Sequence, residues 1–291
     1  MTVLVNLIVT LGMLHVVTTG LRLIDPTRYR RTARLWPLLA TPGALCLWLP
    51  RGAPATALAV LYATATWALA AGAVPLRPRG TRRTGGPLPA PVEVAVLTAL
   101  VSPAVAGTAL VAERAGYRLF GFDLDVLALT VPHFHFAGFT AALVAGLVCR
   151  AAGSDGGSGP GTGASARRAA YSVPTRTLLV LVGYFIGDPA ELVGAVVPTT
   201  GMWAVALTTW RAIRPGARDR ATRALLATSA GVLVVTMLLA LWWATGEATG
   251  ITHPTLTWTA ATHGLGNALG FALCSLCAWR RLTMDRQEMT R

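Results

Sequence analysis

Long apolar blocks dominate this chain, and they limit what it can fold into. Most hold about 20 residues without a charged side chain, the length of an α-helix that crosses the hydrocarbon core of a bilayer. Only 13% of the 291 residues are charged, against about 25% in ordinary soluble domains. The sequence therefore predicts an all-α fold, a polytopic transmembrane bundle of about nine helices. The predicted spans are approximately Val3–Leu23, Leu35–Leu49, Ala53–Leu76, Pro91–Ala112, Val126–Cys149, Thr177–Gly187, Ala190–Trp210, Ala224–Thr245 and Leu256–Trp279.

Arginines mark every second connection between these blocks, and the intervening connections hold most of the acids. Cytoplasmic loops of membrane proteins carry such a basic excess, so the alternation predicts an N-terminus outside and a C-terminus in the cytoplasm. The net charge of +13 is explained by these topology signals, which argues against a nucleic-acid partner. The Ala/Arg/Gly/Pro-rich usage is typical of a high-GC bacterial genome, which predicts a multi-pass protein of the bacterial cytoplasmic membrane.

A Gly/Ser/Ala-rich stretch without apolar pattern separates two sets of blocks. We interpret it as a flexible cytoplasmic linker. The predicted organisation is therefore helices one to five in residues 1–150, the linker in 151–174, helices six to nine in 175–282 and a cytoplasmic tail in 283–291. The sixth block is short and runs into Asp188-Pro189, so eight or ten spans are alternatives.

Ionisable side chains inside a bilayer are costly, and each one raises a functional hypothesis. The predicted topology places five of them at a similar depth toward the outer side, and histidines and carboxylates are the usual proton donors and acceptors of enzymes. We therefore predict a shared acid–base site. Its predicted catalytic residues are His133, His135, His263, Asp188 and Glu191, and its predicted substrate-binding residues are Asn267, Tyr184, Phe139 and Trp258.

Helix geometry refines this hypothesis. His133 and His135 are two residues apart, about 200° on a helix, so they should point to different faces. His263 and Asn267 share one stripe with Gly266 and Gly270, and such a G-x-x-x-G pattern permits close helix packing. The alternative interpretation of all these polar groups is structural. They would then be buried imidazoles and amides with hydrogen bonds to neighbouring helices, and Asp188 and Glu191 would belong to the first turn of a helix.

Two segments resemble a known family. The run Leu129–Phe139, LTVPHFHFAGF, together with Gly121-Phe122, is similar to one signature of the YndJ-like family of bacterial membrane proteins. The run Thr262–Phe271, THGLGNALGF, resembles the second. The resemblance covers mainly the last two-thirds of the chain. It implies a multi-helix membrane protein with the histidines of both motifs as family features, and it implies little about a reaction.

Three functions fit these residues. The first is a cofactor-independent isomerase or cyclase, or an enzyme that opens epoxides, acting on a lipophilic small molecule, as in bacterial natural-product biosynthesis. The second is a non-enzymatic membrane protein for binding, transport or immunity. The third is a metal or haem protein, but ligands two residues apart on a regular helix cannot readily chelate one ion, and the chain has no adjacent His pair. We therefore predict no metal and no other cofactor, with a lipophilic substrate and the lipid bilayer as partners.

Overall fold

The fold is all-α, as the sequence predicts. The structure is a computed structural model that describes residues 2–73, 90–154, 166–172 and 188–289. Every regular element in those ranges is a helix, with no strand among them. Five of the described helical segments are long and apolar enough to cross a membrane: Val3–Ile24, Ala53–Ala71, Pro91–Arg114, Leu124–Gly153 and Arg220–Thr249.

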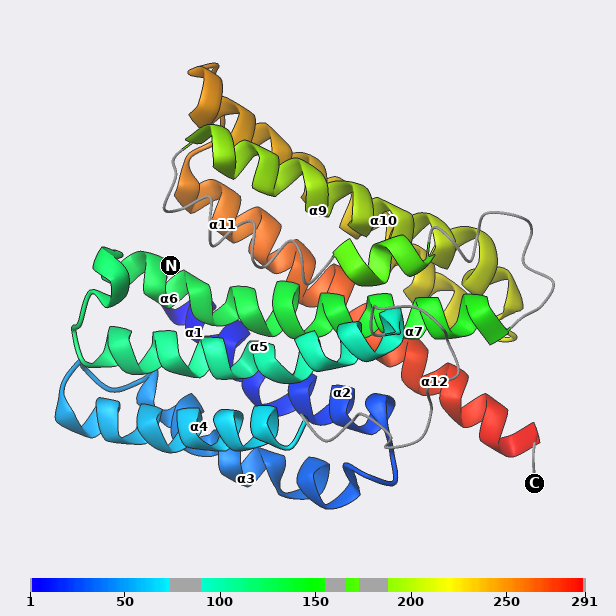
Figure 1. Cartoon of the computed structure of the whole chain (residues 1–291), viewed down its shortest axis with the longest axis horizontal. Helices are drawn as coiled ribbons and strands as arrows, with labels where there is room; N and C mark the ends of the chain where they lie inside the picture. Colours follow the sequence, from blue (N-terminus) through cyan, green and yellow to red (C-terminus); the bar gives the residue numbers. More distant parts are fainter. Residues whose placement is uncertain (1, 74–89, 155–165, 173–187, 290–291) are drawn as a thin grey trace. The chain divides into compact units, whose positions relative to one another are not determined.

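Contacts divide the chain into two compact units, Met1–Thr140 and Ala141–Arg291. In the first unit, α4 packs against α3 on one side and α5 on the other, and α5 packs against α6 and η4 (Figure 1). Small residues permit this close approach, because a side chain at Gly107 of α5 would lie 2.8 Å from Thr66 Oγ1 of α4. The elements of this unit are α1 (Thr2–Leu11), η1 (Gly12–Val16), α2 (Val17–Ile24), α3 (Arg30–Cys46), α4 (Ala53–Ala71), α5 (Pro91–Arg114), η3 (Leu119–Gly121), α6 (Leu124–His133) and η4 (Phe134–Thr140).

In the second unit, the long helix α10 is the centre of the packing. It contacts α9, and it also contacts α11, η7 and α12, which follow one another without a break. The elements are α7 (Ala141–Ser154), a helical stretch at 166–172, α9 (Asp188–Thr208), η5 (Thr209–Ile213), η6 (Arg214–Gly216), α10 (Arg220–Thr249), α11 (Leu256–Leu265), η7 (Gly266–Leu273) and α12 (Cys274–Met289).

Several boundaries differ from the predicted spans. The last helical run does not end near Trp279 but continues to Met289, and residues 166–172 of the predicted linker are helical. The short sixth span, Thr177–Gly187, lies outside the described residues. The number of spans and their direction across the membrane stay predictions.

Four of the described helical segments, η1, η4, η5 and η7, are π-helical. Such segments are rare in proteins and often occur at functional sites. His15 lies inside η1, His135 inside η4 and Asn267 inside η7. Two of the predicted site residues, His135 and Asn267, therefore coincide with departures from regular helix geometry, whereas His133 and His263 lie in the α-helices α6 and α11.

Candidate functional site

A buried histidine and a buried tyrosine form a polar contact in the core of the first unit. His135 Nδ1 lies 2.8 Å from the carbonyl oxygen of Val131, and His135 Nε2 lies 2.6 Å from the hydroxyl oxygen of Tyr62. A carbonyl oxygen can only accept, so Nδ1 carries the proton. In the neutral ring Nε2 is then an acceptor, and the Tyr62 hydroxyl donates to it. Both side chains are fully buried.

Two glycines permit this contact. A β-carbon at Gly12 would lie 2.9 Å from Cβ of His135, and one at Gly43 would lie 2.6 Å from Cγ of Tyr62. The backbones of η1 and α3 therefore lie directly against the two rings. Tyr62 itself comes from α4, so four segments of the first unit contribute to the pair. We refer to Tyr62 and His135 as the Tyr–His pair.

The local sequence explains where His135 sits. Pro132 has no N–H and cannot continue the α-helical hydrogen-bond pattern, and the π-helical segment η4 begins two residues later, at Phe134. His133 is exposed and its ring meets the ring of Phe134 edge-on at 5.6 Å, whereas His135 is fully buried. The two histidines therefore point to different faces, as their spacing predicts. Phe139 is also fully buried.

The second histidine motif forms a separate polar seam inside the second unit. His263 Nδ1 lies 2.8 Å from the carbonyl oxygen of Thr236 on α10, and must donate to it. The Thr236 hydroxyl lies 3.1 Å from Asn267 Oδ1, and Asn267 Nδ2 donates to the carbonyl of His263 at 3.0 Å. Ser229 and Ser275 continue this seam with a hydrogen bond of 2.7 Å between their hydroxyls.

Glycines again bring the helices together. A β-carbon at Gly266 would lie 2.7 Å from Thr236 Cγ2, and one at Gly270 would lie 2.8 Å from Val232 Cγ1. The predicted close packing at this G-x-x-x-G is therefore confirmed, with α10 as the neighbour. His263 and Asn267 both face α10, as expected from their spacing.

The other predicted site residues have different places. Trp258 is 47% exposed near the start of α11. Asp188 and Glu191 belong to the first turn of α9, but their side chains lie outside the described residues, as does the whole of Tyr184. His133 and His135 belong to the first unit and His263 to the second, so a site shared by all five catalytic candidates stays a prediction. Within the described residues, no three His, Cys, Asp or Glu side chains form a group suited to a metal ion.

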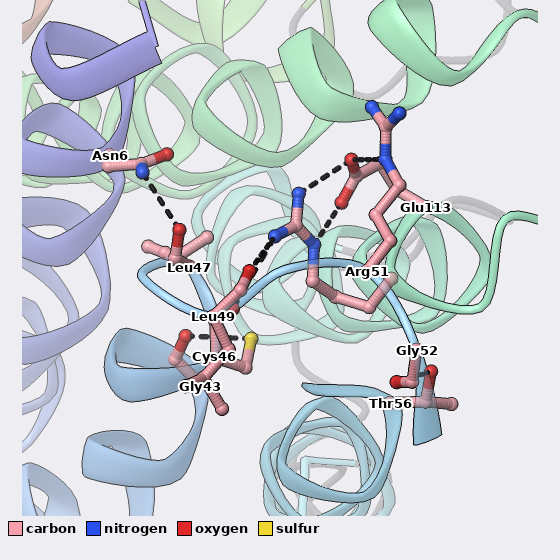
Figure 2. A network of polar contacts seen from close by, with 10 residues as sticks. Asn6, Gly43, Cys46, Leu47, Leu49, Arg51, Gly52, Thr56 and Glu113 are labelled. Atoms are coloured by element: carbon pink, nitrogen blue, oxygen red, sulfur yellow. Dashed lines mark hydrogen bonds and ion pairs between the residues drawn. The ribbon is translucent and has the colours of Figure 1, made fainter. Parts of the chain in front are cut away.

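A buried carboxylate in the first unit was not predicted. Glu113, with a side chain only 2% exposed, pairs with Arg51 at 2.9 Å and with the neighbouring Arg114 (Figure 2). Arg114 also donates to the carbonyl oxygens of Cys46, the last residue of α3, and of Leu49, three residues later. We refer to Glu113, Arg51 and Arg114 as the Glu113 cluster. Its acid lies at the end of an apolar block, where sequence alone indicates a loop position.

Comparison with known proteins identifies the family. The model of the YndJ-like proteins matches residues 7–271. The chain belongs to the YndJ-like family. The match contains both histidine motifs and begins well before the last two-thirds of the chain, so the family relationship extends further than the two motifs indicate. No curated protein and no solved structure matches the chain.

Proposed function

We propose that this YndJ-like protein is a multi-pass enzyme of the bacterial cytoplasmic membrane that acts on a lipophilic small molecule by acid–base chemistry. The observation that carries the proposal is the 2.6 Å hydrogen bond between the Tyr62 hydroxyl and His135 Nε2. Buried polar groups of this kind are costly in a membrane core, and they are often kept for function. No cofactor is part of the proposal.

The hydrogen bonds define a direction for the proton. His135 Nδ1 is held by Val131, so only Nε2 is available to accept. When the Tyr62 oxygen takes a proton from a substrate, its own proton moves to Nε2, and His135 becomes an imidazolium. The reverse transfer returns a proton to another atom of the substrate. The net reaction is an isomerisation or cyclisation, in which no electrons are gained or lost. In epoxide opening, a water molecule would attack a ring carbon and give up the first proton, and the second transfer would protonate the oxygen of the C–O bond that breaks.

Tyr62 is fully buried, so the proposal requires the packing around it to open before a substrate touches it. Tyr62 then contacts the substrate, and His135 holds the proton between the two transfers. The apolar surroundings exclude bulk water, which strengthens the hydrogen bonds involved. His263, Asp188 and Glu191 are not needed for these steps. Their participation in the same site stays part of the wider prediction.

The competing function is a non-enzymatic membrane protein for binding, transport or immunity. The hydrogen bonds of the buried histidines also fit this alternative. His135 is fully buried and uses both ring nitrogens in hydrogen bonds within the first unit, and His263 binds the backbone of a neighbouring helix. In this alternative, the histidines fix helix packing and react with nothing.

Lipid extracts of cells can separate the two functions. Membranes from cells that express the wild-type chain are compared by untargeted mass spectrometry with membranes that contain Tyr62→Phe or His135→Asn. Isomerisation or cyclisation moves a compound to a new retention time at unchanged mass, and epoxide opening adds one water. General acid–base catalysis contributes about 10²- to 10⁴-fold to a rate, so Tyr62→Phe should abolish the conversion.

Two controls sharpen this experiment. Tyr117→Phe removes the hydroxyl of an exposed tyrosine in the same unit and should leave the conversion unchanged. Unfolding of each purified variant shows whether a loss of activity is a loss of folding, because an unsatisfied Nε2 costs about 1–3 kcal/mol. Wild-type extracts that equal those of cells without the protein would contradict the enzyme and favour the structural alternative.

A further inference from the structure

Four buried polar side-chain atoms among the described residues of the second unit have no hydrogen-bond partner, and two of the four belong to the consecutive helices α10 and α11. These two are the indole Nε1 of Trp243 on α10 and the hydroxyl oxygen of Thr259 on α11. A buried donor left unsatisfied costs about 1–3 kcal/mol, and such atoms in native proteins call for an explanation. Thr259 is also unusual for a helical threonine. Thr262 on the same helix donates to the carbonyl four residues earlier at 2.8 Å, a bond that the Thr259 hydroxyl does not make.

The two atoms belong to the same helix interface. Trp243 follows Thr236 by seven residues on a regular α-helix, so both lie on one face of α10. Thr259 precedes His263 by four residues, so both lie on one face of α11. Because His263 binds the Thr236 carbonyl, these are the two faces that meet.

Contacts on both sides of this stretch fix its register. Toward the π-helical end, the anchor is the contact of His263 with Thr236. Toward the connection between the helices, His253 Nε2 lies 3.3 Å from Glu247 Oε1, and a side chain at Gly246 would overlap His253. Trp243 and Thr259 lie between the two anchors, so their unsatisfied atoms share one short section of the α10–α11 interface.

We propose that Trp243 and Thr259 bind the carbonyl oxygen of an uncharged lipophilic molecule in the α10–α11 interface. An indole N–H only donates and a hydroxyl can donate, and one carbonyl oxygen accepts two hydrogen bonds. The ligand is lipophilic because α10 is long and apolar enough to cross a membrane. It is uncharged because no arginine or lysine occurs between residues 240 and 263 to pair with an anion. The site lies within the second unit and does not depend on the acid–base function proposed for the first.

Photo-cross-linking with a ketone can test the site, because the ketone carbonyl reacts with the residues next to it. The purified full-length chain in detergent is irradiated with an alkyl-benzophenone, whose carbonyl group forms the cross-link, and labelled peptides are identified by mass spectrometry. Labelling should map to α10 and α11 near Trp243 and Thr259. A long-chain dialkyl ketone should compete with it, and the hydrocarbon of the same length should not.

Variants with matched controls distinguish specific binding of the ketone from its nonspecific partitioning into the protein–detergent complex. Loss of one hydrogen bond weakens binding by about 3- to 10-fold, so Trp243→Phe and Thr259→Val should each raise the competing ketone concentration by that factor. Trp242→Phe and Thr262→Val should not, because Trp242 Nε1 already donates to the Thr252 carbonyl and the Thr262 hydroxyl to that of Trp258.

A diacylglycerol competitor then distinguishes two sources of the carbonyl. Competition equal to that of the ketone assigns the site to ester groups of membrane lipids, and competition by the ketone alone assigns it to a free small molecule. The proposal is overturned if labelling maps elsewhere, if the hydrocarbon competes as well as the ketone, or if Trp243→Phe behaves like Trp242→Phe.

Discussion

Replacing Glu113 by glutamine should destabilise the first unit strongly, although the side chain keeps nearly the same size. The Glu113 side chain is 2% exposed and the Arg114 side chain 13%, so the variant leaves a nearly buried guanidinium without its anion. Breaking a buried ion pair in this way costs about 3–5 kcal/mol. Arg114 keeps the carbonyls of Cys46 and Leu49 as acceptors, which places the loss at the lower end. Arg51 is 46% exposed and adds less than about 1 kcal/mol. The expected loss is therefore about 3 kcal/mol.

Unfolding in mixed detergent micelles, followed by far-UV circular dichroism, measures this loss. The matched control is Asp123→Asn, which removes the acid of the exposed ion pair between Asp123 and Arg118 and should cost less than about 1 kcal/mol. If Glu113→Gln and Asp123→Asn unfold at the same denaturant concentration, burial does not strengthen the Glu113 cluster and the reasoning fails.

Two further predictions concern packing and pH. Gly43→Ala should destabilise the chain by about 1–3 kcal/mol, because the added methyl group would overpack against Tyr62. The control Gly231→Ala, on an exposed face of α10 with open space around it, should stabilise the chain by about 0.5–1 kcal/mol. Equal effects of the two variants in thermal unfolding would contradict the glycine contacts. Hydrogen bonds from Thr222 lower the pKa of Asp219 from 3.8 to about 2. The stabilising effect of the ionised Asp219 carboxylate should therefore be complete above about pH 4 and decline as the pH falls toward 2. The pH profile of unfolding of Asp219→Asn should lack this decline.

The sequence predicts the helices because apolar length alone decides whether a segment can cross a bilayer. It also predicts contacts that depend on spacing within one helix. His133 and His135 face apart, and Gly266 and Gly270 face a close neighbour. These predictions need only a coarse helical period, which survives although His135 lies in η4 and both glycines lie in η7.

Partners from other helices could not be predicted. Tyr62 lies in an apolar block, and nothing in its neighbourhood indicates that its hydroxyl meets His135. Glu113 stands at the end of an apolar block, a position typical of a loop residue. Its partner Arg51 is distant in sequence, so the sequence does not reveal the ion pair. The π-helical segments have a similar effect, since they change the rotation per residue. An ideal α-helix puts Gly138 on the face of His135, but a side chain at Gly138 would meet Ser102 on α5, while His135 meets Tyr62 on α4.

The π-helical segment η7 has a consequence for how relatives of this chain can vary. A π-turn closes its hydrogen bond one residue later than an α-turn, so it holds one extra residue at nearly the same length. Deleting a single residue between Gly266 and Leu273 would allow the backbone to rewind as an α-helix. An α-turn and a π-turn each complete one rotation, so all later residues would keep their face and Ser275 would keep Ser229 as its partner. One-residue gaps at η7 in an alignment of the family should therefore coincide with an unchanged polar partner on the helix that corresponds to α10, whereas a gap in the regular helix α12 would turn all later residues by about 100°.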